Sequence, residues 1–440
     1  MKKSYGLIAL YVMLIILPVI VATFWGPRPG NSLLWELGKN CALMGFILLA
    51  LQVVLAGRLQ GLERPFGFDI LIRFHRHMGL LAIALLVGHP VLLALGGGGL
   101  RLLISLNVPW PIMVAKVAVL LLVVNVLLSL YAERIRLKFE RWRLLHDIMA
   151  PPILILGFLH SRRIGSDLRI PVLQWYWAIL FFLALVLFVY HRLIRPWRLG
   201  RHRWAVTEVI QELDRVWTVK LEPPEGHRVF DHLPGQFQFI TFYRGRGLPV
   251  EEHHWTISSS PVQKAYLTST IKELGDFTAT IGQTRPGDTA AVQGPFGRFS
   301  YLLRPQDKDL VFVAGGIGIT PLMGMLRHMR DTAADHTVLL IYANRSEEDI
   351  VFRHEIDRIA AGQHPRLSVV HLLSKPGGGW SGETGHLDRE KLERYCRGSV
   401  RGRTFYLCGP PRMIAAAIGM LKDLGVSDER IETEVFSFLG

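Results

Sequence analysis

Four histidines lie in long apolar segments and repeat one spacing. His75 and His89 are 14 residues apart, and so are His146 and His160. Along a helix, 14 residues rise about 21 Å and rotate to within about 40° of four full turns, so both histidines of a pair face one way. Ionisable side chains at membrane depth are costly and usually functional. Two such pairs at matched depth predict two stacked b haems, each ligated by one imidazole from either segment.

Alternatives for these histidines remain open. His77 and His89 are 12 residues apart, which rotates the second side chain by about 120° and matches the other segment poorly. Whether His77 replaces His75 as a ligand is therefore not decided by the spacing. Membrane histidines also serve as hydrogen-bonded helix residues, but that role requires no repeated spacing. His191 precedes Arg192 at the end of an apolar run and is expected to anchor the interface.

The chain provides membrane spans that can carry these histidines. Half of its 440 residues are hydrophobic, and the mean hydropathy is positive, at +0.29. Apolar runs near 5–25, 33–56, 74–95, 110–131, 144–160 and 172–194 approach the roughly 20 residues that cross a bilayer core. The first run follows two lysines but is too long for a signal peptide, so it is expected to be retained. The fifth run is marginal and contains Pro151 and Pro152.

The charge distribution orients these six spans. Residues 1–203 contain 23 Lys and Arg against 7 Asp and Glu, whereas residues 204–440 contain 27 against 29. The basic connections 57–73, 132–143 and 192–203 lie on one side, which the positive-inside rule makes cytoplasmic, together with the second half of the chain. These features predict an integral protein of a bacterial-type inner (plasma) membrane, in contact with lipid and without a nucleic-acid partner.

The cysteines exclude several other classes of site. The three cysteines, Cys41, Cys396 and Cys408, are far apart, and none forms a CxxC motif. The sequence therefore predicts no disulfide framework, zinc site or four-thiolate iron–sulfur cluster.

The second half of the chain has a different pattern of residue types, which predicts two further domains. Runs at 204–209, 217–221 and 237–242 have the residue types of strands in an antiparallel β-barrel. From Leu310 onward, strands alternate with helices, as in a parallel-sheet α/β nucleotide domain, and the boundary is placed near Pro305. The predicted fold class is a multi-domain membrane protein with an all-α six-helix transmembrane bundle, then an antiparallel β-barrel domain, then an α/β parallel-sheet domain.

Glycine-rich and hydroxyl-rich motifs occur in both of these domains. Gly315, Gly316 and Gly318 follow a strand and open a helix, where backbone N–H groups can approach a pyrophosphate. The segment LCGPPRM follows a later strand, and ligands of such sheets bind beyond the carboxyl ends of the strands. In the barrel region, LPGQF, HHWTISSSP, ELGDFT and GPFGRF occur in this order. Each supplies a turn suited to a flat ring or a diphosphate.

This order of motifs, with a terminal EVFSF, resembles the ferredoxin–NADP reductase type of FAD/NAD(P)H module. Joined to six spans with paired histidines, the whole chain resembles the ferric reductase and NADPH oxidase superfamily, especially its short bacterial members. The resemblance implies a haem domain at 1–198, an FAD-binding barrel at 199–305 and an NAD(P)H-binding domain at 306–440. It also implies that electrons pass from NADPH or NADH through FAD to an inner haem (His75, His146), an outer haem (His89, His160) and an external acceptor.

The resemblance further assigns the residues of the reductase module. The flavin motif is matched by His253, Trp255, Thr256 and Ser258, and the flavin pyrophosphate turn by Gly275 and Thr278. The NAD(P)H diphosphate is assigned to Gly315, Gly316, Gly318, Thr320 and Pro321, and the nicotinamide region to Cys408, Gly409 and Pro410. Phe436 corresponds to the aromatic residue that covers the flavin. Thr256, Cys408 and Phe436 are expected to be catalytic, although Cys408 and Phe436 are alternatively core residues.

The sequence departs from the family at one position and lacks one of its regulatory features. His254 stands where the flavin motif usually has proline. The absence of an EF-hand loop implies activity without a calcium switch.

The electron acceptor and the nucleotide preference are less constrained. Arg162, Arg163 and Arg101 on the outer side are candidates to neutralise haem propionates, attract an anionic ferric chelate or stabilise superoxide, or they only meet lipid headgroups. Reduction of oxygen to superoxide is the expected activity. The alternatives are a ferric or cupric chelate reductase and an electron-transfer subunit for a periplasmic partner protein. The sequence indicates no oligomeric state and no redox potentials.

Residues after the strand VLLIYAN bear on the choice between NADPH and NADH. Arg345 and Ser346 favour the 2′-phosphate of NADPH. Glu347, Glu348 and Asp349 favour NADH, or they complement a helix amino terminus. Mixed use with a modest NADPH preference is expected.

Overall fold

The computed structural model describes residues 2–26 and 32–435, and it divides into two compact units. The first unit covers Met1–Pro196 and the second covers Trp197–Gly440. Each unit is described separately below.

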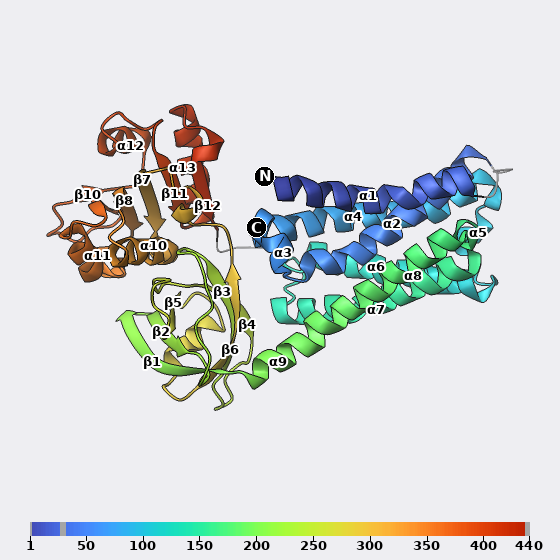
Figure 1. Ribbon diagram of the computed structural model, residues 1–440, viewed down its shortest axis with the longest axis horizontal. Coiled ribbons are helices and arrows are strands. Elements are labelled where there is room, and N and C mark those ends of the chain that lie inside the picture. The colour runs from blue at the N-terminus through green and yellow to red at the C-terminus, as the bar shows by residue number, and fades with distance from the viewer. Residues whose placement is uncertain (1, 27–31, 436–440) are drawn as a thin grey trace. The chain divides into compact units, whose positions relative to one another are not determined.

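The first unit is a bundle of helices (Figure 1). In the described residues, six helices are long and apolar enough to cross a membrane, as predicted. The helices of this unit are α1 (Lys2–Trp25), α2 (Leu33–Ala56), α3 (Gln60–Phe66), α4 (Phe68–Leu93), α5 (Arg101–Ile104), α6 (Trp110–Tyr131), α7 (Phe139–Ile164) and α8 (Pro171–Val189). Helix α9 (Arg195–Arg201) begins in this unit and ends in the second.

The observed spans agree closely with the apolar runs. The runs 33–56 and 110–131 coincide with α2 and α6. The run 144–160 is only the middle of the longer helix α7, which continues through Pro151 and Pro152. Proline is tolerated there because neighbouring helices can satisfy the freed backbone groups. The third and sixth spans lengthen through π-helical turns at Ala94–Gly98 and Tyr190–Ile194.

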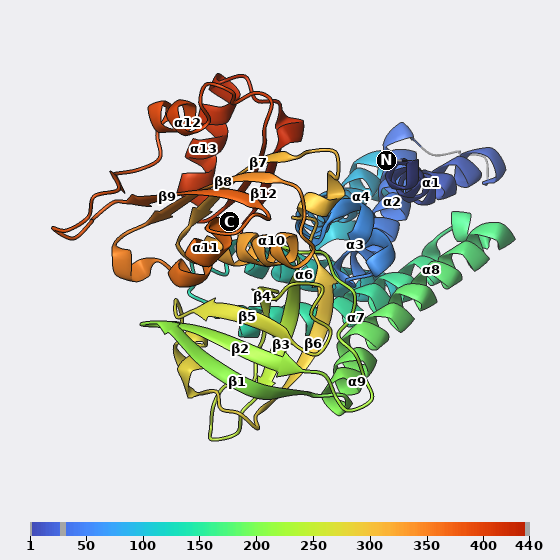
Figure 2. The same ribbon diagram turned by 60° about the vertical axis from the view of Figure 1, so that its left-hand side comes forward.

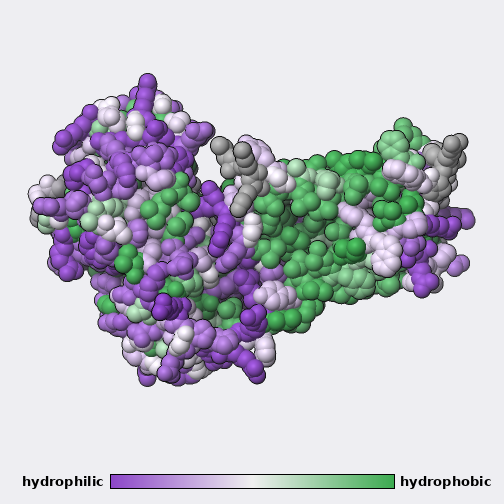
Figure 3. All heavy atoms as spheres, in the orientation of Figure 1, coloured by the Kyte–Doolittle hydropathy of each residue, from purple (hydrophilic) through white to green (hydrophobic). Residues whose placement is uncertain are grey.

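The surface of this bundle is apolar, as expected for a lipid-facing protein. Hydrophobic side chains cover the face of the helices that Figure 3 shows. Large apolar residues such as Ile179, Val186 and Leu120 are more than half exposed. Inside the bundle, Phe46 of α2 stacks on Trp177 of α8, with ring centroids 4.7 Å apart. The protein is therefore an integral membrane protein by the character of both its surface and its core.

The second unit begins with an antiparallel sheet. Its strands are β1 (Trp204–Leu213), β2 (Val216–Glu222), β3 (Phe237–Tyr243), β4 (Glu252–Thr256), β5 (Leu267–Lys272) and β6 (Thr289–Phe296), in the spatial order β4-β3-β6-β1-β2-β5. Just beyond β4, the Ser258 N–H donates to the Thr268 carbonyl on β5, 2.9 Å away. The two edge strands are thus joined at one end, and the sheet curls toward a barrel.

A parallel sheet with helices on both faces follows. Its strands are β7 (Asp309–Gly315), β8 (Thr337–Asn344), β9 (Arg366–Leu373), β10 (Glu383–Thr384), β11 (Thr404–Cys408) and β12 (Ile431–Glu434), in the order β10-β9-β8-β7-β11-β12. Its helices are α10 (Ile319–Asp331), α11 (Arg353–Ala360), α12 (Arg389–Tyr395) and α13 (Pro411–Asp423). Figure 2 shows α10 and α11 on one side of the sheet and α12 and α13 on the other.

The two faces of β7 explain this layering. Leu310 and Phe312 pack in the core that includes α10 and α11, whereas Val311 and Val313 pack in the core that includes α12 and α13. Successive strands run outward from β7 to β10, and β11 then returns to the other side of β7. The strand order therefore reverses between β7 and β11, which is where open α/β sheets bind ligands. The predicted fold class is confirmed.

Candidate functional site

The structure brings the four predicted histidines together as two pairs. His75 and His89 lie on α4, and His146 and His160 lie on α7. The ring centroids of His75 and His146 are 6.2 Å apart, and those of His89 and His160 are 6.3 Å apart. The interplanar angles, 66° and 64°, are also nearly equal. The bundle thus repeats one arrangement of two imidazoles at two levels.

The separation within each pair suits a single metal atom. Imidazole nitrogens bind metals at about 2.0–2.1 Å, so two opposed ligands place their nitrogens about 4 Å apart. Adding roughly 1.1 Å from nitrogen to ring centre on each side gives about 6.3 Å between centroids. The observed 6.2 Å and 6.3 Å match this value. The residues present therefore fit two haem irons, each of which one histidine of α4 and one histidine of α7 would hold.

Hydrogen bonds orient three of the four rings. The Nδ1 atoms of His89 and His160 lie 2.9 Å from the carbonyl oxygens of Gly38 and Pro111, respectively. His146 Nδ1 lies 2.8 Å from Oδ1 of the buried residue Asn125. Because these oxygens accept, each Nδ1 donates and leaves Nε2 with a free lone pair for a metal.

The fourth ring is held less well, and a polar network surrounds His146. Among the described residues, the buried Nδ1 atom of His75 forms no hydrogen bond of good geometry, although the main chain of Gln52 lies close to the ring. Trp142 Nε1 donates to Ser129 Oγ at 3.1 Å, and Ser129 Oγ donates to the Asn125 carbonyl at 2.8 Å. Asn125 and Ser129 were not predicted from the sequence, although a polar residue within the apolar span 110–131 is an available signal.

The structure also separates the remaining histidines from these pairs. His77 is exposed, and its Nδ1 lies 2.7 Å from the carbonyl oxygen of Arg73, so it is His75 that faces His146. His191 lies in the π-helical turn after α8, with its Nδ1 3.3 Å from a guanidinium nitrogen of Arg195. The adjacent Arg192 pairs with Asp147 at 2.7 Å.

The cationic residues near the other end of the bundle have local partners. Arg162 donates to the Leu168 carbonyl at 3.3 Å, and the Arg163 guanidinium lies 5.6 Å from the ring centre of Trp110. Arg101 begins the short helix α5. The contacts of Arg162 and Arg163 support a structural use of these two side chains, which leaves their proposed role toward an acceptor as a prediction.

In the second unit, the glycine turn lies where the sheet order reverses. Gly316 has φ +53°, and an added Cβ there would meet nothing within 4 Å, so the turn is open on that side. The Tyr342 hydroxyl donates to the Gly316 carbonyl at 3.1 Å and accepts from the Val351 N–H at 3.2 Å. Through these two hydrogen bonds Tyr342 stabilises the glycine turn, a role that was not predicted from the sequence.

The residues after the turn begin α10 and are buried. The Thr320 hydroxyl donates to the Ile317 carbonyl at 3.0 Å, so it stabilises the turn itself. Pro321 is buried in the first turn of the helix. The Thr320 contact is made by the side chain, so the first backbone N–H groups of α10 can still donate to a ligand. Such groups at a helix amino terminus suit a diphosphate.

The CGPP segment contacts the glycine turn directly. A Cβ on Gly318 would lie 2.2 Å from the Cys408 carbonyl oxygen, and a Cβ on Gly409 would lie 3.0 Å from Gly315 Cα. A Cβ on Gly315 would lie 2.8 Å from Pro410 Cδ. Only glycine permits this approach of the two loops.

Cys408 itself is fully buried. Its burial, with a smaller contribution from Glu434, raises the pKa of the thiol well above its ordinary value. The thiol therefore stays neutral, and it is the main chain of Cys408 that adjoins the turn.

The flavin motif residues cluster along β4 and the segment after it. His253 packs on Phe277, with ring centroids 4.1 Å apart, and its Nε2 lies 3.1 Å from a carboxylate oxygen of Glu251. Thr278 Oγ1 accepts from the N–H groups of Leu274 and Gly275, both at 2.8 Å. These two bonds fix the conformation of the predicted pyrophosphate turn. The turn is open at Gly275, where an added Cβ would meet nothing within 4 Å.

The core of this motif is held by β5. The buried Thr256 offers its carbonyl to Ser269 Oγ at 2.9 Å, and Ser258 Oγ lies 2.9 Å from Thr268 Oγ1. Trp255 packs against the barrel core, and its Nε1 is buried without a hydrogen-bond partner among the described residues. His254 continues β4 and pairs with Phe239 of β3, so the motif remains extended without proline.

The residues after β8 form a short helical turn that begins at Glu347. Asp349 Oδ2 accepts from both the N–H and the hydroxyl of Ser346, at 3.1 Å and 2.9 Å. Glu347 lies 3.6 Å from Arg353. Ser346 thus caps this turn and Asp349 bonds back to it, so the acidic run lies at a helix amino terminus, which is one of the two roles expected for it. Arg345 is exposed directly beyond the strand. Phe436, the expected flavin cover, lies outside the described residues.

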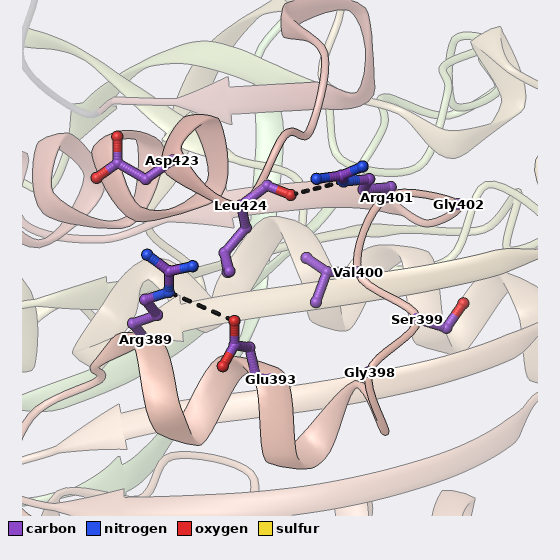
Figure 4. A pocket seen from close by; sticks show the side chains of 9 residues that line it. All are labelled: Arg389, Glu393, Gly398, Ser399, Val400, Arg401, Gly402, Asp423 and Leu424. Carbon is purple, nitrogen blue, oxygen red and sulfur yellow. Dashed lines mark hydrogen bonds and ion pairs between the residues drawn. The ribbon is translucent and has the colours of Figure 1, made fainter.

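A separate pocket of about 590 Å³ lies near the amino end of β11, whereas the glycine turn lies at the carboxyl end of β7 (Figure 4). Its lining includes the loop that precedes β11 and the end of α13, and its arginines are engaged locally: Arg389 with Glu393 at 3.4 Å, and Arg401 with the Leu424 carbonyl at 3.0 Å. This pocket does not belong to the nucleotide site.

Comparisons with known proteins assign both halves. Residues 41–157 match the family model of the ferric reductase like transmembrane component, and residues 312–418 match that of the oxidoreductase NAD-binding domain. NADH-cytochrome b5 reductase 1 of Cryptococcus neoformans is 32% identical over 266 residues, which cover 52% of this chain and 89% of the relative.

Other known proteins match about half of the chain as well. NADH-cytochrome b5 reductase 1 of Dictyostelium discoideum is 29% identical over 204 residues, which cover 42% of this chain and 71% of the relative. A solved FAD/NAD-binding domain of nitric oxide dioxygenase from Vibrio cholerae is 23% identical, with a TM-score of 0.47, and the match covers 53% of this chain and 98% of that one.

These matches place a b5 reductase-type FAD/NAD-binding module behind a ferric reductase-type membrane domain. The chain therefore joins a ferric reductase-like transmembrane component to a module of the NADH-cytochrome b5 reductase family, which matches the predicted ferric reductase/NADPH oxidase-like fusion. It is a membrane oxidoreductase that takes electrons from NAD(P)H.

Proposed function

We propose that this protein carries electrons from cytoplasmic NAD(P)H through FAD and two b haems to oxygen on the outer side of the membrane, forming superoxide. The proposal rests on the two matched histidine pairs of α4 and α7, whose ring centroids are 6.2 Å and 6.3 Å apart. Two such levels in one bundle suit two redox centres placed along a core about 30 Å thick.

The bound groups would supply chemistry that side chains cannot. When bound, FAD would supply a carrier that takes two electrons and one proton as a hydride and gives up electrons singly, and haem iron would supply a carrier of one electron at a time. The chain's own residues bind and orient these groups. His75 and His146 would hold the inner haem, and His89 and His160 the outer haem.

The reductase residues divide the binding work. Gly315, Gly316 and Gly318 would offer N–H groups to the dinucleotide diphosphate, and the Gly275–Thr278 turn would do the same for FAD. Arg345 is exposed beside the strand end where a 2′-phosphate is read in such folds, which supports the modest preference for NADPH.

A metal chelate is the second candidate acceptor. The match of residues 41–157 to a ferric reductase like component favours it. Because two histidines would hold each haem iron, neither acceptor is expected to bind the iron itself, and either would take its electron near the haem edge.

The test uses the purified full chain loaded with haem and FAD. NADPH oxidation is followed first with oxygen alone and then with a ferric chelate under argon. Oxygen-dependent turnover with cytochrome c reduction that superoxide dismutase abolishes supports the oxidase. Turnover only with the chelate rejects oxygen as the acceptor and supports the reductase. Turnover only after a periplasmic extract is added rejects both and indicates a protein partner.

A further inference from the structure

Helix α10 contacts both halves of the reductase module. Its amino terminus follows the glycine turn, whereas its middle packs on the barrel segment that continues from β4. A Cβ on Gly324 would lie 3.0 Å from the Ile257 carbonyl oxygen. One turn later, His328 Nδ1 lies 2.7 Å from the hydroxyl of Tyr301. Residues 324, 327 and 328 share one helix face, so this face is the contact with the barrel.

Arg327 makes the central contact on this face. Its NH1 group donates to the Ser258 carbonyl at 2.7 Å. Ser258 belongs to the flavin motif, two residues after Thr256. A guanidinium on the dinucleotide helix is thus hydrogen-bonded to the main chain of the flavin-binding segment.

The remaining donors of Arg327 are held by α11. Nε and NH2 donate to the two carboxylate oxygens of Glu355, at 2.9 Å and 2.6 Å. The guanidinium carbon lies 4.8 Å from the ring centre of Phe352, a buried residue whose φ of +61° is unusual for a bulky side chain. A bidentate, stacked arginine has little freedom, so its position is set by α11.

We propose that Arg327 is a positioning residue for hydride transfer, which holds the flavin segment at a fixed place along the helix whose first turn binds NAD(P)H. The inference rests on the proposed function only in that FAD and NAD(P)H occupy the module. Hydride transfer needs its two reacting atoms about 3–3.5 Å apart, and a misplacement of about 1 Å can cost roughly 100-fold in rate. A rigid bridge from helix to flavin segment controls this distance without touching either ligand.

Arg330 offers a matched control. It lies one turn further along α10, and its NH1 is 3.2 Å from the same Glu355 carboxylate. Its other partner is the neighbouring Asp331, and within the part of the chain that the structure describes, neither contact reaches the barrel. Replacing Arg330 therefore removes a charge from Glu355 but leaves the bridge to Ser258.

The experiment measures flavin reduction in the full chain in detergent, by stopped-flow absorbance without oxygen. Arg327→Met is expected to slow the saturating rate constant by roughly 10- to 100-fold and to weaken the long-wavelength charge-transfer absorbance between nicotinamide and flavin. The dissociation constant for the nucleotide should change by less than about threefold. Arg330→Met should reduce flavin at close to the wild-type rate.

Further variants decide the remaining outcomes. Arg327→Lys cannot keep both the bidentate pair and the Ser258 contact, so an intermediate rate is expected. If Arg327→Met fails to retain FAD, Arg327→Lys is the deciding variant, and a wild-type rate in it overturns the proposal. Equal losses in the Arg327 and Arg330 methionine variants also overturn it. Wild-type protein that NAD(P)H does not reduce would instead count against the proposed function itself.

Discussion

At the scale of single residues, the two histidine pairs differ in what holds them. The His89 and His160 rings are oriented by main-chain carbonyls, which no substitution of a partner side chain removes. The His146 ring is oriented by the side chain of Asn125. The hydrogen bond to a ligating imidazole raises its basicity, and a more basic ligand stabilises the oxidised iron.

Asn125 is therefore expected to tune one haem only. Asn125→Leu removes the acceptor for His146 Nδ1 and should raise one of two haem midpoint potentials, while Asn125→Asp adds a negative charge and should lower the same one. The measurement is a spectroelectrochemical titration of the purified full chain. A shift of both potentials together, or of neither, would contradict the assignment of Asn125 to the inner haem.

Protonation of a buried histidine is expected to limit the stability of the reductase half in acid. His232 precedes the LPGQF run and is 8% exposed. Burial lowers its pKa from the ordinary 6.5 to about 4. Between these values the unfolded chain binds a proton that the folded chain does not, so stability falls as the pH falls, by up to about 1.4 kcal/mol per pH unit.

The prediction is checked by denaturant unfolding of the full chain in detergent at pH 7 and pH 5. Unfolding is monitored by the rise in flavin fluorescence as FAD is released. His232→Gln should lessen the fall in the free energy of unfolding between pH 7 and pH 5, because glutamine does not titrate. His354→Gln, which changes an exposed histidine on α11, serves as the control and should leave the loss unchanged. Identical pH dependence in wild-type and His232→Gln protein would refute this role.

At the scale of elements, the turn between β7 and α10 depends on close packing against the turn after β11. Gly318 has an ordinary helical φ of −61°, so its backbone would accept any residue. The restriction is the Cys408 carbonyl oxygen, 2.2 Å from the position of an added Cβ. Main-chain atoms cannot swing aside as a side chain can, so the two loops would have to separate.

Gly318→Ala is thus expected to weaken NADP⁺ binding at least tenfold, roughly the effect of 1.4 kcal/mol, because it disturbs both loops of the site. Gly419→Ala on α13 meets nothing within 4 Å and should bind NADP⁺ normally, with a small gain in helix stability. Binding is measured by difference absorbance of the flavin during titration with NADP⁺. Unchanged affinity in the Gly318 variant would argue against the glycine turn as the diphosphate site.

At the scale of the whole molecule, the chain joins a lipid-facing unit to a polar reductase unit, and each has its own hydrophobic core. The cores of the membrane bundle and of the reductase sheets consist of different residues, within Met1–Pro196 and Trp197–Gly440 respectively. Chemistry in the reductase unit should therefore survive changes that disable the membrane unit.

Substituting a histidine ligand tests this independence. His89→Ala and His146→Ala should each lower the haem content from two towards one per chain and stop reduction of the outer acceptor. NADPH-driven reduction of a small soluble dye, which needs only the reductase unit, should continue at close to the wild-type rate. His77→Ala is the control on α4 and should keep both haems. Loss of haem from the His77 variant, or its full retention in the His89 and His146 variants, would contradict the proposed ligands.

Much of this architecture follows from the amino-acid order. The spans, the strand-rich region, the parallel α/β part and the histidine spacing follow from hydropathy and from periods of 2 and 3.6 residues, which depend only on neighbours along the chain. The glycine turn was also found, because a strand, a glycine cluster and a helix follow one another directly.

Only the tertiary structure decided which groups from distant segments meet. The choice of His75 over His77, the orientation of His146 by Asn125, the support of Gly316 by Tyr342 and the bridge from Arg327 to Ser258 each join residues of different elements. Such contacts depend on how helices and sheets pack around shared cores, to within a fraction of an ångström. Local sequence carries the shape of each element but not the distance between two of them.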